Sequence, residues 1–506
     1  MKNLDHTNRI AAGLLLLALC AQTAACGESA AETTDTEPTD LQETAAVTET
    51  VTETVFETDH LPDTLDFGGK TVTVHVRADD DTIKEMYAES ENGDTVNDAV
   101  FRRNLEVEER LNISLNTVYN DGWANYGKTL TLLNSTIAAG DPAYDIIAGW
   151  SAQIPSLVLK GCFMNLLDMD YLDFSRVWWN QSVVESSTIN DRIYLATGDI
   201  AMSLLNSTYV VFFNKEMTQE RDINDLYSVT FDGKWTIDRL SALSKDVYTD
   251  LNGDGKHDPD DRYGYYAIYG TNPDDGFMAS TLIRMLRQDG KGNYVLNTDI
   301  SRVTMLAEKL YSMYFENEGV YASPINEFPD GDLQGATMFS ENRAMFIMDY
   351  LGAISDYGLN NMKADFGILP YPKMDEAQET YGSFVQNAVS LWGIPVSAAD
   401  PSMSAAVMEA LASGGYRHIT PAFYETALKV KYSRDNETVQ MLDLIKESGQ
   451  LDFEIIYNES IGSIRYIMRE LMIKKNKDVA SYYQKKQNSY QKALDKLIGY
   501  FNELDS

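Results

Sequence analysis

The chain has 506 residues, 44% of them hydrophobic, with 41 Lys and Arg against 77 Asp and Glu. The formal net charge of −36 argues against binding of nucleic acid or of an anionic lipid surface by the folded part of the chain. Only one of the three Cys, Cys162, lies beyond the first 26 residues, so no disulfide framework is expected, and the five His show no zinc-like spacing.

The first 26 residues have the pattern of a secretory signal. Lys2 and Arg9 precede an apolar run at 10–20, and the sequence TAACG follows at 23–27. The apolar run is too short to span a bilayer, which favours a signal peptide over a transmembrane helix. The small-small-Cys-Gly ending resembles the lipobox of bacterial lipoproteins. This resemblance implies that Cys26 carries a lipid anchor and that the mature protein works at the extracellular face of the cytoplasmic membrane.

Residues 27–64 are mostly Thr, Glu, Ala and Asp and include no Lys or Arg. Such a segment buries too little apolar surface to offset its ordering entropy, and its like charges keep it extended. We interpret it as a disordered acidic tether between the anchor and a folded body. A tail without a mechanical role is the alternative, and the preceding anchor motif favours the tether.

The remaining residues, roughly 440, are enough for two lobes. The patterns predict strands at 71–76, 113–118 and 144–148, separated by helices at 94–111 and 126–139. This β-α-β-α-β order indicates parallel strands with helical crossovers, and therefore an α/β lobe. Ligands of such sheets bind at the carboxyl ends of the strands, which is where Gly149 and Trp150 fall.

A second lobe is expected to begin near residue 206. The apolar segments there predict strands at 209–213, 344–348 and 366–369. Helical periodicity is present at 237–247, 303–315, 405–412 and 478–498, the last with many Lys and Gln on its surface.

Three blocks of sequence carry a family resemblance. They are 138–150 (AAGDPAYDIIAGW), 209–215 (YVVFFNK) with 233–236 (GKWT), and 341–346 (ENRAMF) with 365–372 (DFGILPYP). In this order they resemble the type II extracellular solute-binding proteins of bacterial ABC importers, the maltose-binding-protein-like class. The resemblance implies an α/β fold of two lobes joined by hinge crossovers, with a helical C-terminal segment. The first lobe would hold 65–205 and 384–430, and the second 206–383 and 431–506.

The resemblance also implies a lipid-anchored, monomeric binding protein, not an enzyme, that captures a carbohydrate by lobe closure and delivers it to permease subunits. Aromatic rings cover the apolar face of a sugar, while carboxylates and amides bind its hydroxyls. Trp150 lies where the family has a sugar-stacking Trp. The other expected ligand-binding residues are Trp178, Trp179, Asp199 and Tyr350. For each Trp, packing in the core is the alternative.

Residues 250–261 (DLNGDGKHDPDD) resemble an EF-hand-like calcium loop. Asp250, Asn252, Asp254, Asp258 and Asp261 would supply side-chain oxygens, and Lys256 would supply a backbone carbonyl. A strand-like segment follows, so the expected role is one structural Ca²⁺ ion. An acidic turn without metal is the alternative.

The sequence contains no Gly-x-Ser-x-Gly elbow, phosphate-binding Gly-rich loop or His-Glu-x-x-His motif. An extracellular glycan-active enzyme stays as an alternative because paired acids cannot be recognised among so many carboxylates. A binding protein for another solute, such as a peptide, is the third hypothesis.

Overall fold

The computed structural model of the chain describes residues 56–290, 293–328, 330–424 and 436–503. Residues Phe56–Ser506 form one compact unit, and the following description concerns this unit alone. The signal, Cys26 and most of the predicted tether lie outside the described residues. Among the described helices, none combines the length and the apolar character that crossing a membrane requires.

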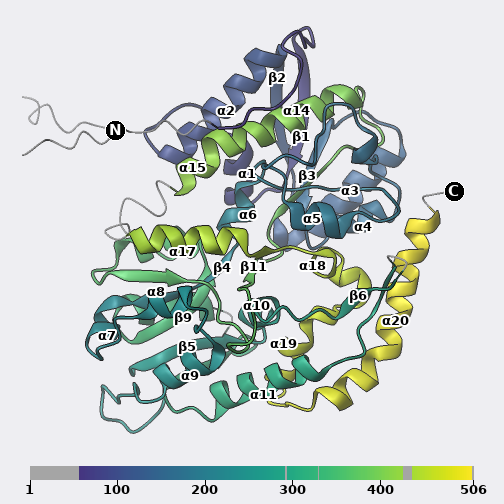
Figure 1. Cartoon of the computed structure of the whole chain (residues 1–506). Helices are drawn as coiled ribbons and strands as arrows, with labels where there is room; N and C mark the ends of the chain where they lie inside the picture. Colours follow the sequence, from purple (N-terminus) through teal and green to yellow (C-terminus); the bar gives the residue numbers. More distant parts are fainter. Residues whose placement is uncertain (1–55, 291–292, 329, 425–435, 504–506) are drawn as a thin grey trace, which may run out of the picture. The chain divides into compact units, whose positions relative to one another are not determined.

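The first sheet has the strand order β12-β3-β1-β2 (Figure 1). Its strands are β1 Lys70–Val76, β2 Ile113–Tyr119, β3 Ile146–Trp150 and β12 Ser390–Gly393. β1 pairs in parallel with both β2 and β3, which confirms the predicted β-α-β-α-β unit. β12 comes from a distant part of the chain and pairs antiparallel with β3.

Helices connect these strands where the sequence predicts them. α2 Thr95–Leu111 begins after Asp94, whose carboxylate accepts hydrogen bonds from the backbone N–H groups of Val96 and Asn97 at 3.1 and 2.8 Å. α3 Tyr126–Ala138 ends before Gly140, whose φ of +69° suits a residue without a Cβ. α14 Pro401–Gly414 is buried along most of its length and packs against α2.

The second sheet has the order β10-β4-β9-β5-β8. Its strands are β4 Tyr209–Asn214, β5 Tyr263–Tyr269, β8 Val320–Pro324, β9 Ala344–Tyr350 and β10 Phe366–Leu369. Every residue of β4 and β5 is buried, which explains their continuous apolar and aromatic sequence. Two short ladders, β6 Leu286–Gln288 with β7 Tyr294–Leu296 and β11 Ser383–Phe384 with β13 Gly449–Gln450, complete the described strands.

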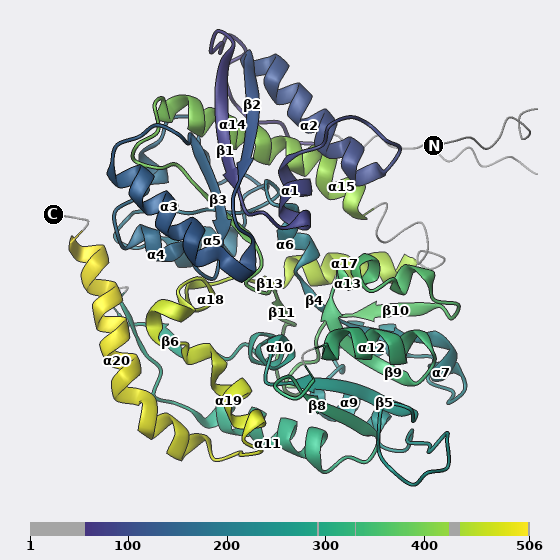
Figure 2. The ribbon, with the colours of Figure 1, turned by 180° about the vertical axis from the view of Figure 1, so that it is seen from behind.

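The remaining α-helices lie around the two sheets (Figures 1 and 2). They are α1 Asp80–Met86, α4 Pro155–Val158, α5 Gln181–Ser187, α6 Met202–Asn206, α7 Lys215–Gln219, α8 Leu226–Phe231, α9 Ile237–Ser244, α10 Asn272–Ser280, α11 Ser301–Phe315, α12 Gly331–Ser340, α13 Ala353–Asp356, α15 Thr420–Phe423, α17 Asn436–Glu447, α18 Phe453–Ile456, α19 Ile467–Ile473 and α20 Val479–Glu503.

The chain passes from one sheet to the other through α6 and returns through the segment that contains β11. These two passages are tied together and to the first sheet. The backbone N–H of Gln386, after β11, donates to the carbonyl of Ser207, after α6, at 3.1 Å. The backbone N–H of Ser390, the first residue of β12, donates to Ser203 Oγ of α6 at 3.1 Å. The two crossings are therefore in direct contact.

Contacts with the folded body begin earlier than predicted. Residues 56–64 belong to the predicted tether, yet Leu61 is buried in the core around β1, and Asp59 forms an ion pair with Arg110 at 2.5 Å. Phe56 also packs edge-on against Tyr416. The composition of the segment concealed these anchoring residues, because they stand singly among Glu, Thr and Asp.

Candidate ligand-binding cleft

A pocket of about 450 Å³ opens at the carboxyl end of β3. Trp150, the last residue of β3, lines it together with residues of α3 and α4. The C-terminal part of the chain contributes Ile456 of α18, Glu459 and Ser460 of the 3₁₀ helix Asn458–Ile461, and Tyr466. Asn387, in the segment before β12, also lines the pocket. The pocket thus joins chain segments more than 300 residues apart in the sequence.

Trp150 is held in place by its neighbours. Its backbone N–H donates to Tyr126 Oη at 3.0 Å, and the Tyr126 ring meets the indole edge-on with 5.8 Å between centroids. The Arg77 guanidinium, from the end of β1, lies 5.8 Å from the centroid of the indole ring. Arg77 forms an ion pair with Asp79 and lies 3.9 Å from Asp81. These contacts fix the indole at the edge of the pocket.

Tyr466 has a similar support in the C-terminal segment. The Arg469 guanidinium lies 4.1 Å from the centroid of the Tyr466 ring. Arg469 in turn donates to the Asp275 carboxylate and to Asn272 Oδ1, the latter at 2.8 Å. Burial raises the pKa of Tyr466 to about 12, so its hydroxyl is neutral at physiological pH. Trp150 and Tyr466 therefore each contact an arginine side chain that forms an ion pair with an aspartate.

Polar groups continue from this pocket into a smaller cavity. Asn387 Nδ2 donates to Tyr466 Oη at 3.4 Å, and the backbone carbonyl of Asn387 accepts from Ser151 Oγ at 2.7 Å. Asn387 and Tyr466 also line the adjoining cavity, together with Asp275, Phe384, Ile455, Asn458 and Arg465. Amide and hydroxyl groups between aromatic rings suit a ligand with apolar faces and a fringe of hydroxyls.

The family model for bacterial extracellular solute-binding proteins matches residues 108–414. The match covers more than half of the chain, including β2, β3 and β12 of the first sheet and every strand of the second sheet. The chain belongs to the bacterial extracellular solute-binding proteins. No curated protein sequence matches it significantly.

Solved structures of solute-binding proteins share the fold at low sequence identity. A cyclo/maltodextrin-binding protein complexed with maltotetraose is 14% identical, with 86% of this chain and 96% of that chain covered and a TM-score of 0.53. The galacto-N-biose/lacto-N-biose I-binding protein of the ABC transporter from Bifidobacterium longum is 14% identical, with 86% and 98% covered and a TM-score of 0.53. An ABC transporter solute-binding protein from Thermotoga lettingae, bound with α-D-tagatose, is 14% identical, with 84% and 100% covered and a TM-score of 0.53. These matches confirm the predicted type II two-lobe α/β fold.

Trp178 and Trp179 of this solute-binding protein lie in the core and not in the cleft, which corrects their predicted role. Their side chains are 0% and 1% exposed, and both indole N–H groups donate to the Glu409 carboxylate of α14 at 3.1 and 3.0 Å. One buried carboxylate accepts the hydrogen bonds of both indole N–H groups, so packing in the core explains why two adjacent Trp residues occur here.

Asp199 and Tyr350 lie outside the pocket of Trp150. Asp199 accepts a hydrogen bond from Thr420 Oγ1 of α15 at 2.6 Å, and burial raises the pKa of its carboxyl. Tyr350, at the end of β9, donates from its hydroxyl to Asp356 at 2.8 Å and packs near Tyr209 and Tyr357. These contacts give both residues structural partners, and a ligand contact for either stays a prediction.

Two aromatic residues, one on the pocket and one outside its lining, are absent from the sequence prediction. Tyr466 ends the 3₁₀ helix Ile464–Tyr466, which is too short for a periodic pattern to mark it. Trp123 begins the 3₁₀ helix Trp123–Asn125 after β2, is 67% exposed, and its backbone N–H donates to the Asp79 carboxylate at 3.2 Å. β1, β2 and β3 are parallel and end at the same edge of the sheet. The reasoning that predicted Trp150 from the end of β3 therefore applies equally to Trp123, which follows β2.

The acidic loop at 250–261 is closed by its own side chains. The Asp250 carboxylate accepts from the backbone N–H groups of Gly253 and Gly255 at 2.7 and 3.0 Å, and Asn252 and Asp254 accept from residues two positions on. Asp261 is fully buried and accepts from the Leu251 backbone at 3.1 Å. Across the described residues, no three His, Cys, Asp or Glu side chains are gathered as a metal site requires. The calcium loop therefore stays a prediction.

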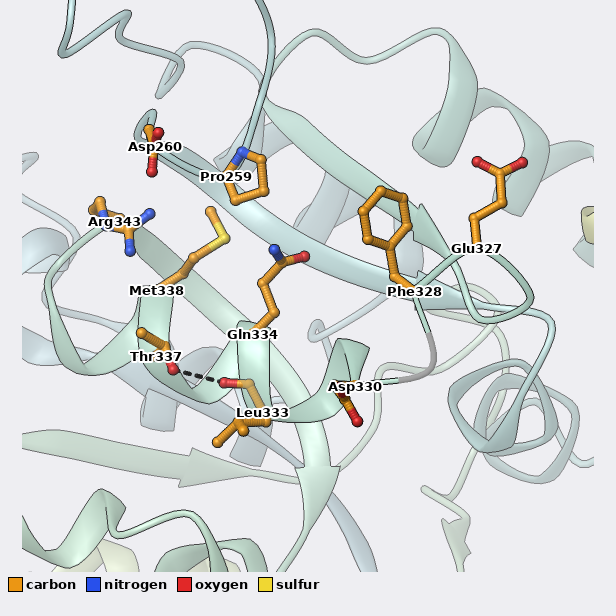
Figure 3. A pocket seen from close by; sticks show the side chains of 10 residues that line it. All are labelled: Pro259, Asp260, Glu327, Phe328, Asp330, Leu333, Gln334, Thr337, Met338 and Arg343. Carbon is orange, nitrogen blue, oxygen red and sulfur yellow. Dashed lines mark hydrogen bonds between the residues drawn. The ribbon is translucent and has the colours of Figure 1, made fainter.

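A second pocket, of about 470 Å³, lies beside this loop (Figure 3). Figure 3 shows Phe328 on one side, Asp260 and Arg343 on the other, and Gln334 and Met338 of α12 between them. None of the predicted sugar-binding residues lines it. With Phe328 as its one aromatic residue among the described lining residues, it lacks the paired rings of the Trp150 pocket.

Proposed function

We propose that this solute-binding protein captures an oligosaccharide in the pocket of Trp150 and Tyr466 and presents it to an ABC importer. The observation that carries this proposal is that two aromatic rings from distant parts of the chain, each packed against an arginine, line one pocket at the carboxyl edge of a sheet. Sugars have apolar C–H faces that such rings cover, while Asn387, Gln153 and Ser156 offer hydrogen-bonding groups.

Known relatives favour a carbohydrate over other solutes. Proteins with the same fold are complexed with maltotetraose, lacto-N-biose or tagatose. The mechanism proposed here is binding without chemistry, in which the two lobes close on the ligand about α6 and the β11 segment. The hydrogen bond from the Gln386 N–H to the Ser207 carbonyl joins these two crossings at 3.1 Å and supports their movement as one hinge.

The proposed location is the outer face of the cytoplasmic membrane. The signal-like start and the lipobox-like residues before Cys26 support a lipid anchor, and the acidic composition of 27–55 supports an extended tether. A Cys26→Ser variant is expected to appear in the soluble fraction, whereas the parent chain partitions into detergent. Equal partitioning of the two would exclude the anchor.

We also propose one structural Ca²⁺ ion in the loop at 250–261. The proposal rests on the order of oxygen-bearing residues Asp250, Asn252 and Asp254, and on the positive φ of Gly255, which is +75°. Lys256 would contribute its carbonyl, and Asp258 and Asp261 would complete the set. The ion would hold the loop against β5, which begins two residues after Asp261.

The experiment that tests the sugar proposal is a thermal-shift screen of the purified chain against oligosaccharides, peptides and amino acids. A ligand that binds only the folded state raises Tm by mass action. We expect one or more oligosaccharides to raise Tm, and peptides to leave it unchanged. If only peptides raise Tm, the ligand of this protein is a peptide and not a carbohydrate.

A further inference from the structure

The charged side chains on the lining of the Trp150 pocket bear on which sugars can bind there. Among the described residues that line it, Glu459 is the only carboxylate and there is no Lys or Arg. Glu459 is exposed, and its carboxylate accepts a hydrogen bond from the neutral hydroxyl of Ser463 at 3.4 Å. A ligand in this pocket therefore meets one negative charge and no positive charge on the lining.

The arginines closest to the pocket are already engaged by acidic partners. Arg77 is paired with Asp79, and its side chain is 6% exposed. Arg469 is paired with Asp275, whose side chain is 5% exposed. In the adjoining cavity Arg465 is 2% exposed and lies 3.6 Å from Glu454. A ligand carboxylate would have to displace Asp79 or Asp275 to pair with Arg77 or Arg469. Arg465 lies in the adjoining cavity and not on the lining of the Trp150 pocket.

From this arrangement we infer that the pocket accepts uncharged sugars and amino sugars and rejects sugars that carry a carboxylate. The inference rests on the proposed sugar-binding function and narrows its substrate class. A uronate bound here would lose water from its carboxylate without gaining a cation, and it would face Glu459. An ammonium group would instead be attracted to Glu459.

The test is calorimetric titration of the full chain with matched oligosaccharides. Each set contains a neutral glucose, galactose or mannose oligosaccharide, its uronate counterpart and its amino-sugar counterpart, all of one length and linkage. We expect a neutral member to bind and its uronate counterpart to bind at least about tenfold more weakly at low salt. The difference should shrink as salt screens the repulsion from Glu459.

A Glu459→Gln variant separates the charge from the shape of the pocket. The ratio of the uronate Kd to the neutral Kd is expected to fall toward one in this variant. The matched control is Glu308→Gln, which neutralises an exposed residue of α11 outside the pocket and should keep the parent ratio.

Three results are decisive. Weak uronate binding with a ratio that depends on Glu459 supports the inference. A uronate that binds as tightly as its neutral counterpart, or more tightly, overturns the inference while the proposed sugar-binding function stands. If no sugar from any set binds, the proposed function fails and the inference fails with it.

Discussion

Trp150 is the residue whose replacement should weaken ligand binding most clearly. A Trp150→Ala change removes a ring that Tyr126 and Arg77 hold at the pocket. Loss of one stacking ring is worth about 1–2 kcal/mol, which corresponds to roughly 5- to 30-fold in Kd. Calorimetry with a sugar identified by the thermal-shift screen measures this change.

The control for that variant is Phe231→Ala, which truncates an aromatic residue that is 48% exposed on α8 and lies outside the pocket. It should bind the sugar like the parent chain. Equal affinity of Trp150→Ala and the parent chain would remove Trp150 from the binding site.

Glu409 should make stability depend on pH. Burial raises the pKa of its carboxyl from 4.5 to about 7, although Trp178 and Trp179 donate to it. A folded pKa above the unfolded value means that the folded protein holds a proton that the unfolded chain has released. The contribution of Glu409 to the free energy of unfolding is therefore fully present below pH 4.5. It is lost as the pH rises to about 7, which lowers the free energy of unfolding by up to about 3 kcal/mol.

The measurement is Tm between pH 4.5 and 8 for the parent chain and for Glu409→Gln. Asp274 and Glu454 also have pKa values raised to about 7 by burial, so the variant should lose part of the pH dependence and not all of it. Identical pH profiles for the two proteins would show that Glu409 is ionised in the folded state throughout.

At the level of residues, the sequence predicts those side chains whose position follows from the end of a strand. Trp150 lies at the end of β3, as the β-α-β-α-β pattern predicts, and its contact with a ligand stays a prediction. The sequence did not distinguish Trp178 and Trp179 from ligand-binding residues. Their hydrogen-bond partner Glu409 lies 231 and 230 residues further along the chain, so no local pattern reveals it. Tyr466 depends in the same way on Arg469 and Asp275, whose proximity no local pattern reveals.

Among the elements, the contact between Asp199 and the π-helix Gly415–Ile419, which follows α14, should tolerate no added atom at Gly415. A Cβ on Gly415 would lie 1.9 Å from the backbone carbonyl oxygen of Asp199. We expect Gly415→Ala to destabilise the protein by about 2 kcal/mol or more, since backbone must shift to make room. Gly127→Ala is the matched control, because its Cβ meets nothing within 4 Å in α3. Denaturant unfolding should find the control neutral or slightly stabilised, and equal effects of both changes would contradict the packing described.

The acidic loop gives the second prediction for an element. Calcium is expected to raise Tm of the parent chain relative to chelator, because an ion bound by the folded loop stabilises that state. Asp250→Ala should abolish the difference between calcium and chelator, whatever its own effect on Tm. An unchanged melt of the parent chain with chelator would leave the loop as an acidic turn held by the hydrogen bonds of Asp250.

Elements with a strong apolar pattern were predictable, including the short strands β4 and β10, and elements without one were not. α2, α3 and α11 lie within two residues of the predicted bounds because their apolar faces repeat over three or more turns. β8 and β11 have no such signal, since their strands are short and their pairing partners are distant. The position of β12 beside β3 follows from tertiary pairing alone.

For the molecule as a whole, the order of sequence blocks indicated the fold more reliably than any one block. The solute-binding family model and the structures of distant relatives confirm a two-sheet α/β protein. The pocket, in contrast, is assembled from β3, the segment before β12 and the C-terminal helices. Such an assembly cannot be read from local patterns, because its sides meet only after both sheets have formed.

The most direct measurement is titration of the purified chain with an oligosaccharide that raises its Tm, followed by mass spectrometry of the recovered sugar. Capture without chemistry predicts saturable binding of one sugar per chain and complete recovery of the sugar at its original mass. Accumulation of shorter sugars at a rate proportional to protein concentration would show instead that the chain cleaves its ligand.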